Sequence, residues 1–212
     1  PWALDARFDR VLMAHGYLVE RLSVQGDNDG RVFRRLHVAG ATRDDGAFDL
    51  RIAPEQGGRH LVATAAQAGD LLRALDVTGT MQGGSLTVSG NYDDTVPGRP
   101  LHGTATLTDF RVARAAALGK LLQAMTLYGL LDVLRGPGLA FSRMVAPFTL
   151  SDGMLELSDA RAFSPSLGLT AKGRIDVDGN TVDLQGTIVP AYFFNSLLGN
   201  VPLVGRLFSP ER

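Results

Sequence analysis

The feature that most constrains this chain is the alternation of apolar and polar residues from Pro147 to Pro190. A period of two is typical of strands with one apolar and one solvated face. Asp152-Gly153 and Asp178-Gly179-Asn180 interrupt the alternation, and such residues favour tight hairpin turns. The segment therefore predicts an antiparallel ladder. Its apolar positions are Phe148, Leu150, Leu155, Leu157, Leu167, Leu169, Ala171, Ile175, Val177, Val182, Leu184 and Ile188.

A sheet with one long apolar face must cover that face, because a large exposed apolar patch is unfavourable in water. The cover is either a set of helices from the same chain or a bound ligand. The alternation itself leaves both alternatives open.

The N-terminal half carries the same signal in shorter pieces. Short strand-like segments recur at a spacing of roughly ten residues, with a turn signal at each join, which is typical of an antiparallel meander. A short helix is predicted at 67–76, where the alternation breaks, and a loop at Asp93–Pro100. The predicted strands are Arg7–Leu12, Leu18–Val24, Val32–Val38, Phe48–Ile52, His60–Thr64, Ser85–Tyr92 and Leu101–Val112.

Residues 115–135 change to steps of three and four residues, which favours one helix or a pair of helices with a wide apolar stripe. Lys120, Gln123 and Asp132 interrupt the stripe, so we do not expect it to span a membrane. Gly136-Pro137-Gly138 ends it. The stripe contains Leu118, Leu121, Leu122, Met125, Tyr128, Leu131 and Leu134.

A second apolar helix is predicted in the tail at 191–208, with a break near Gly199-Asn200. Its apolar residues do not fall on one stripe, so this helix must be buried, inserted or covering something. The alternative is a purely structural helix that packs on the sheet of its own chain. The apolar residues expected to take part are Phe193, Phe194, Leu197, Leu198, Leu203 and Val204.

Composition excludes several classes of function. The formal net charge is −1, and the longest basic feature is Arg31, Arg34 and Arg35, which is too small for a nucleic-acid interface. The absence of cysteine excludes thiol catalysis, thiolate zinc sites and disulfides. The chain begins with Pro1, so we expect a processed product or a fragment of a longer protein.

Motifs for catalysis or metal binding are incomplete in this sequence. Gly83–Thr87 approaches a nucleophile elbow, but Thr87 stands where a glycine is needed. Asp176–Asn180 resembles the start of a calcium loop without its later glutamate, and a hairpin turn explains it better. The histidines are too scattered to suggest a metal site. We therefore predict a protein that is not an enzyme and needs no cofactor. The histidines are His15, His37, His60 and His102.

Three segments resemble the C-terminal region of the AsmA-like proteins, the group of Gram-negative envelope proteins that includes TamB and YhdP. These segments are 168–176 (GLTAKGRID), 182–192 (VDLQGTIVPAY) and 195–205 (NSLLGNVPLVG). Asp109–Val112, the predicted helix at 115–135, Gly138–Phe141 and Phe148–Gly153 fit the same region in the same order. The resemblance covers roughly residues 80–208.

The resemblance implies a periplasmic protein, anchored to the inner membrane by an N-terminal helix outside this sequence. It implies a curled β-sheet whose apolar groove carries phospholipid acyl chains toward the outer membrane, with a role in outer-membrane biogenesis. The ladder residues would then bind lipid, and the two apolar helices would bind lipid or cover the groove. The groove residues are Phe148, Leu150, Leu155, Leu157, Leu167, Leu169, Ile175, Val177, Val182, Leu184 and Ile188. The helix residues are Leu118, Leu121, Leu122, Met125, Phe193, Phe194, Leu197, Leu198, Leu203 and Val204.

Together these observations predict an α+β, mainly β fold, in which antiparallel strands curl into a groove or partial barrel with two or three short apolar helices. Residues 1–112 would form the meander with one short helix, and residues 113–212 the AsmA-like region, unless one continuous sheet spans both. The expected function is non-enzymatic binding and transfer of lipid. The alternative is a structural module in which the helices fill the groove and the domain docks other envelope proteins.

Overall fold

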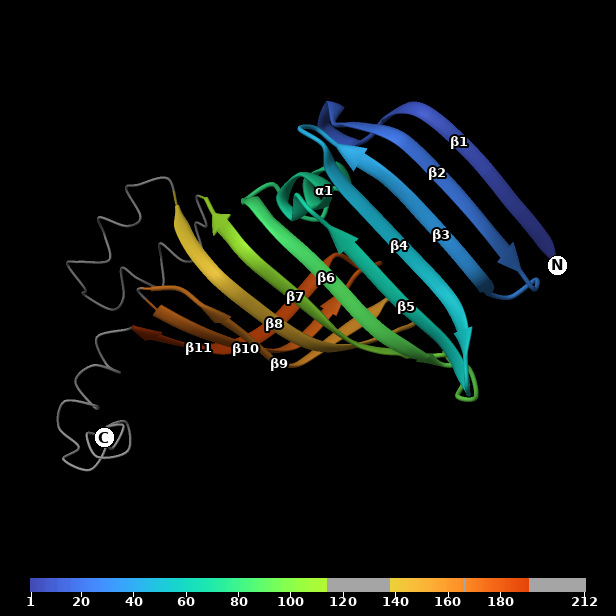
Figure 1. The fold of residues 1–212 in the computed structure, drawn as a ribbon. Helices are drawn as coiled ribbons and strands as arrows, with labels where there is room; N and C mark the ends of the chain where they lie inside the picture. The colour runs from blue at the N-terminus through green and yellow to red at the C-terminus, as the bar shows by residue number, and fades with distance from the viewer. Residues whose placement is uncertain (114–137, 166, 191–212) are drawn as a thin grey trace, which may run out of the picture.

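The strands of this protein form one open antiparallel sheet. The computed structural model describes residues 1–113, 138–165 and 167–190. Within them the sheet has eleven strands, and each strand pairs with its neighbours in the chain, so β1 and β11 are the two edges (Figure 1). The strands are β1 (Trp2–Leu12), β2 (Leu18–Asn28), β3 (Phe33–Thr42), β4 (Gly46–Glu55), β5 (Gly58–Ala65), β6 (Met81–Asp93), β7 (Leu101–Val112), β8 (Leu139–Ser151), β9 (Met154–Phe163), β10 (Leu167–Asp176) and β11 (Thr181–Pro190).

The mainly β fold class predicted from the sequence is confirmed. The helix predicted at 67–76 is also present, as α1 (Ala68–Ala74), and a short 3₁₀ turn, η1 (Ala14–Gly16), joins β1 to β2. The helices predicted at 115–135 and 191–208 lie outside the described residues. β7 and β8 pair from Leu101↔Leu150 to Val112↔Leu139, so one sheet spans both predicted parts of the chain.

Two predicted hairpin turns are confirmed. Asp152 and Gly153 join β8 to β9, and both have the positive φ that a two-residue turn of this kind requires (48° and 75°). In the β10–β11 turn the Gly179 N–H donates to Asp176 Oδ1 at 2.7 Å. The prediction was wrong for Val177, which lies in this turn and not on the strand face, because β10 ends at Asp176.

Most strands are longer than the sequence pattern predicted, and β1 and β8 extend furthest at their starts. β1 begins at Trp2, because β2 continues to Asn28 and offers backbone partners along its whole length. The Trp2 ring also packs edge-on against Phe33, with 5.3 Å between ring centroids. β8 begins at Leu139, since the entire length of β7 is available for pairing.

Because the chain runs as a meander, alternate connections lie at opposite ends of the sheet. One end, here called the helix end, carries η1, the β3–β4 turn, α1 and the β9–β10 connection. The other end, here called the turn end, carries the β2–β3, β4–β5, β6–β7, β8–β9 and β10–β11 connections (Figure 1).

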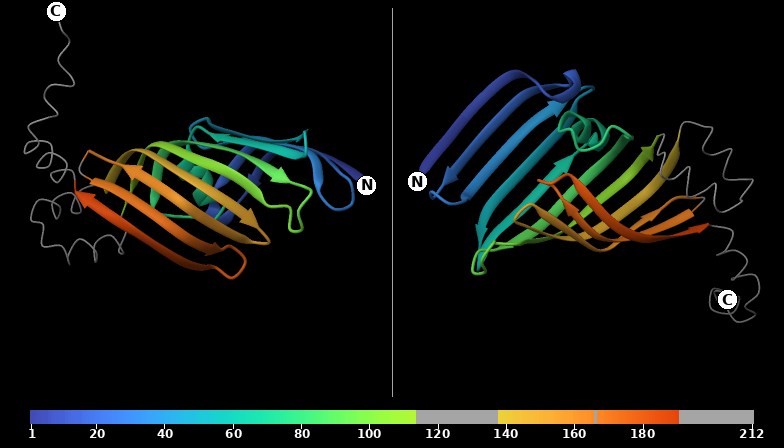
Figure 2. Two further views of the ribbon diagram at one scale, coloured as in Figure 1. Left: turned by 90° about the horizontal axis from the view of Figure 1, so that it is seen from below. Right: turned by 180° about the vertical axis from the view of Figure 1, so that it is seen from behind.

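Apolar side chains at the helix end form the largest core cluster. A single sheet buries side chains this fully only where it curls, and the curl of β6–β11 is visible in Figure 2. Arg73 fixes α1 over this end by donating to the Tyr17 hydroxyl at 2.8 Å and to the Met81 carbonyl at 3.0 Å. The cluster contains Ala68, Met81, Leu107, Phe110, Leu139, Phe141, Ala162 and Leu167.

A second cluster lies on the same face, nearer the turn end. It is built on Ile52, Leu61 and Leu101, with further side chains from β3 to β8 packed against it. The Phe148 ring lies over Gly103: a Cβ added to Gly103 would come within 2.8 Å of Phe148 Cζ. A glycine at this position lets the aromatic ring cover the neighbouring backbone.

Candidate functional site

The predicted ladder residues line up in rows across one face of the sheet. Strand register places Phe148 opposite Leu157, and Gly173 joins Leu157 to Leu184 in the same row. The next row runs Leu150, Leu155, Ile175 and Val182. Such rows give the sheet an apolar face that continues from strand to strand.

An irregularity in the pairing of β9 keeps this face continuous. The register of β9 shifts against both β8 and β10, next to Ser158 and Asp159. Ala160 and Leu157 therefore lie on the same face, although they are three residues apart. This is the effect of a β-bulge, which adds one residue to one strand.

The predicted site residues differ widely in exposure. Leu167 is only 1% exposed within the cluster at the helix end, and Leu169 and Ile188 pack against that cluster. Toward the β11 edge Leu184 is 40% exposed and Val182 65%. The apolar face is thus filled by packed side chains at the helix end and is accessible at the β11 edge.

The helix residues predicted to cover this face lie outside the described residues. They are Leu118, Leu121, Leu122, Met125, Phe193, Phe194, Leu197, Leu198, Leu203 and Val204.

A buried arginine lies on the apolar face, and sequence reasoning missed it. Arg59 has the same phase in β5 as Leu61 and is only 5% exposed. Its guanidinium donates to Asp94 through Nη2 at 2.8 Å and Nε at 2.9 Å. Nη1 donates to the Phe33 carbonyl at 3.1 Å, and the group lies 4.0 Å from the centroid of the Tyr92 ring.

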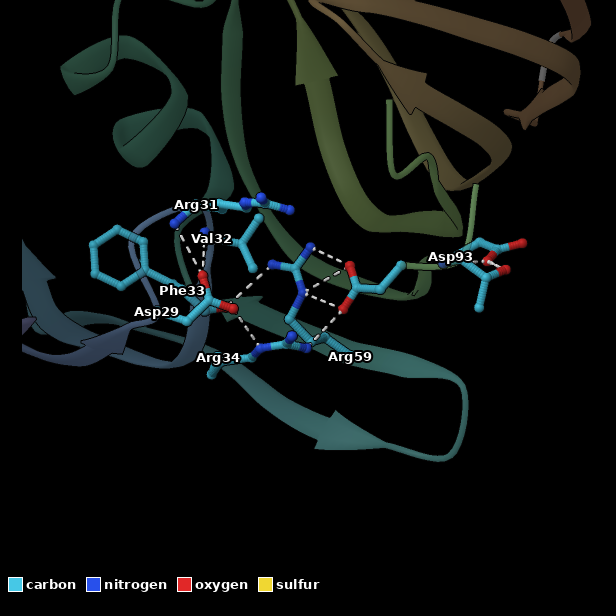
Figure 3. Close-up of polar contacts among 9 residues, drawn as sticks. Asp29, Arg31, Val32, Phe33, Arg34, Arg59 and Asp93 are labelled. Carbon is cyan, nitrogen blue, oxygen red and sulfur yellow. Dashed lines mark hydrogen bonds and ion pairs between the residues drawn. The ribbon is translucent and has the colours of Figure 1, made fainter. Parts of the chain in front are cut away.

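The Arg59–Asp94 pair belongs to a chain of charges at the turn end (Figure 3). Arg34 joins the two carboxylates, donating to Asp29 through Nε at 2.7 Å and to Asp94 through Nη1 at 3.4 Å. Hydrogen bonds from the Val32 and Arg31 backbone N–H groups lower the pKa of Asp29 to about 2. The pKa of Asp94 is also lowered, chiefly by the hydrogen bonds from Arg59.

These charges surround a pocket of about 350 Å³, here called the rim pocket. The β2–β3 connection, β3 and the β6–β7 loop supply its walls. Within the described residues, Arg31 and Arg99 line this pocket without an ion pair of their own. The lining residues are Asp29, Arg31, Val32, Arg34, Asp94 and Arg99.

The polar face carries scattered contacts among residues considered for catalysis. Ser85 Oγ lies 2.8 Å from Thr108 Oγ1, on exposed strand positions. Ser89 Oγ lies 3.4 Å from His60 Nε2, which is long for a hydrogen bond between a nucleophile and its base. Among the described residues no group of three or more His, Cys, Asp or Glu side chains is placed to hold a metal ion.

None of the helices within the described ranges is both long and apolar enough to cross a bilayer. Comparison of the chain with family models, with curated proteins and with solved structures finds no match. The resemblance to the AsmA-like proteins therefore stays a prediction from the sequence segments alone.

Proposed function

We propose that this chain is a non-enzymatic lipid-binding and transfer module of an AsmA-like envelope protein. In this proposal the parent protein is anchored to the inner membrane, and the module works in the periplasm on phospholipid acyl chains moving toward the outer membrane. The observation that carries the proposal is the continuous apolar face, which is accessible at the β11 edge, where Val182 and Leu184 are exposed.

The energetics of acyl-chain transfer favour such a surface. Removing one methylene from water contributes about 0.8 kcal/mol, so a lipid with two long chains needs apolar contact along its whole path. Rows of leucine, isoleucine and valine across the strands offer that contact. A pocket of about 510 Å³ across β1–β4 adds further space, with Leu4, Leu36 and Ile52 among its lining residues.

Site-specific photocrosslinking in cells tests the proposal. A benzophenone amino acid at Leu157 or Leu184 is expected to capture phospholipid. The same probe at the adjacent Ser158 or Gln185, whose side chains belong to the polar phase of each strand, is the matched control and is expected to capture none. Equal labelling on both faces, or no labelling at all, would contradict lipid binding by the apolar face.

The alternative function is a docking module for other envelope proteins. It is favoured by the first strand, an edge of the sheet, where Phe8 is 49% and Leu12 71% exposed. An edge strand of this kind offers unpaired backbone groups as well as apolar side chains. Under this alternative, the same probe at Phe8 or Leu12 would crosslink to protein, and the probes at Leu157 and Leu184 would capture no lipid.

A further inference from the structure

The rim pocket brings more arginines together than its carboxylates can neutralise. Asp94 accepts hydrogen bonds from Arg59 and Arg34, and Asp29 accepts from Arg34 and from two backbone N–H groups. Four arginines therefore surround two aspartates, which leaves two positive charges in excess around the pocket.

The excess charge is carried by side chains that are free to bind an external anion. Both carboxylates already accept hydrogen bonds from other groups, and Arg31 and Arg99 line the pocket with no ion pair among the described residues, although the charge of Arg99 helps to lower the pKa of Asp94 from a distance. They come from different connections, β2–β3 and β6–β7, and therefore approach the pocket from two sides. Guanidinium groups arranged around a cavity match the oxygens of a phosphate group, each through two parallel N–H donors.

The rim pocket also adjoins the apolar face. Asp94, in its wall, binds Arg59, and the Arg59 guanidinium stacks on Tyr92. Tyr92 in turn packs against the cluster of Ile52, Leu61 and Leu101. A charged group in the pocket would thus lie at the end of an apolar surface, which is the arrangement that an amphiphile requires.

We infer that the rim pocket binds a phosphate group through Arg31 and Arg99, and that this group is the headgroup phosphate of a lipid whose acyl chains lie on the apolar face. The placement of the acyl chains rests on the proposed function, whereas the phosphate site does not. Asp29 and Asp94 line the same pocket, but Arg34 and Arg59 neutralise their charges through hydrogen bonds. Free inorganic phosphate has the same chemistry, so the test must separate the two sources.

Calorimetric titration of the 212-residue chain provides the test. The probes are dihexanoylphosphatidylglycerol, the phosphate-free dihexanoylglycerol, and inorganic phosphate. The double variant R31Q/R99Q is expected to bind the phospholipid at least about tenfold more weakly and to bind dihexanoylglycerol as the unchanged chain does. The control R10Q/R43Q removes two exposed arginines that line neither the rim pocket nor the pocket across β1–β4, and it is expected to change neither affinity. Thermal melts check that all variants remain folded.

The outcomes separate this inference from the proposed function. If both lipids bind and R31Q/R99Q loses nothing, or loses no more than R10Q/R43Q, the phosphate site is refuted and lipid binding stands. If inorganic phosphate binds as tightly as the phospholipid and R31Q/R99Q alone loses it, the phosphate site stands and the lipid source is refuted. If no probe binds, both are refuted.

Discussion

The Arg59 guanidinium lies in an almost fully buried position, surrounded by Asp94, the Phe33 carbonyl and the Tyr92 ring. Bringing a charge out of water costs several kcal/mol unless a partner of opposite charge and good geometry accompanies it. Asp94 supplies two oxygens to the planar fork of the arginine, which is the strongest geometry for such a pair.

Asp94→Asn is expected to destabilise the fold by about 3 kcal/mol, because it leaves the buried Arg59 charge without its counter-ion. Urea denaturation at neutral pH measures the change. Asp159→Asn is the matched control, since Asp159 also pairs with an arginine but on an exposed part of β9. A loss no larger for Asp94→Asn than for this control would contradict the structural role of the pair.

The same carboxylate makes stability depend on pH. Arg59 lowers the pKa of Asp94 in the folded state below the value of about 4 expected in the unfolded chain. A lowered folded-state pKa contributes stability that is complete above about pH 5 and is lost as the pH falls through the folded pKa. The gap in unfolding free energy between the unchanged chain and Asp94→Asn should therefore be constant near neutral pH and shrink below about pH 4. Urea titrations at stepwise lower pH measure this gap, and a constant gap down to pH 3 would contradict the assignment.

At the residue scale, the sequence held a signal for Arg59 but not for its partner. Arg59, Leu61, Ala63 and Ala65 alternate on the same phase of β5, so the arginine falls on the apolar face by parity alone. A charged residue within a strand is usually assigned to the solvated face, so the position of Arg59 on the apolar face is easily overlooked. Asp94 lies in a loop beyond the next strand, and no local pattern specifies that it returns to Arg59.

Among the elements, alternation and turn chemistry predicted strands and hairpins well, whereas strand ends depended on pairing. Asp152-Gly153 fixes a hairpin because both residues accept positive φ. The starts of β1 and β8 are set by the lengths of β2 and β7, which is information that no single segment contains. Val177 shows the same limit, since its alternation continues into a turn.

The contact between β7 and β8 gives a prediction at the scale of these elements. A Cβ added by Gly103→Ala would lie 2.7 Å from the Ser89 carbonyl oxygen and 2.8 Å from Phe148 Cζ, so the ring or the backbone must move. We expect a loss of about 1–3 kcal/mol, measured by urea denaturation.

Gly168→Ala provides the control for this prediction, because a Cβ at that position in β10 meets no atom within 4 Å. It is expected to be neutral or slightly stabilising, through a smaller entropy of the unfolded chain. Equal losses in the two variants would show that the effect comes from glycine in a strand and not from the Phe148 contact.

On the scale of the whole molecule, the two ends of the sheet differ in character. The helix end is sealed by packed apolar side chains and by α1, which Arg73 ties to Tyr17 and β6. The turn end carries the charges of the rim pocket. An amphiphile bound as proposed would therefore be oriented, with its charged group at the turn end and its chains on the accessible part of the apolar face.

The strands lie in the sheet in the same order as in the sequence, and this has a consequence for how the protein folds. Each strand joins an edge formed by the strand before it, so most pairing steps close only a short loop and cost little chain entropy. Assembly can then spread outward from an early hairpin, as in repeat proteins whose units contact only their neighbours.

Hydrogen exchange should accordingly show the highest opening free energies in β5–β8 and a stepwise decline toward β1 and β11. Equal opening free energies in all strands would instead indicate a single all-or-none transition.

With stepwise growth, the N-terminal strands could pair while the later strands are still being synthesised. The first hydrogen bonds of the sheet would then form without the C-terminal strands.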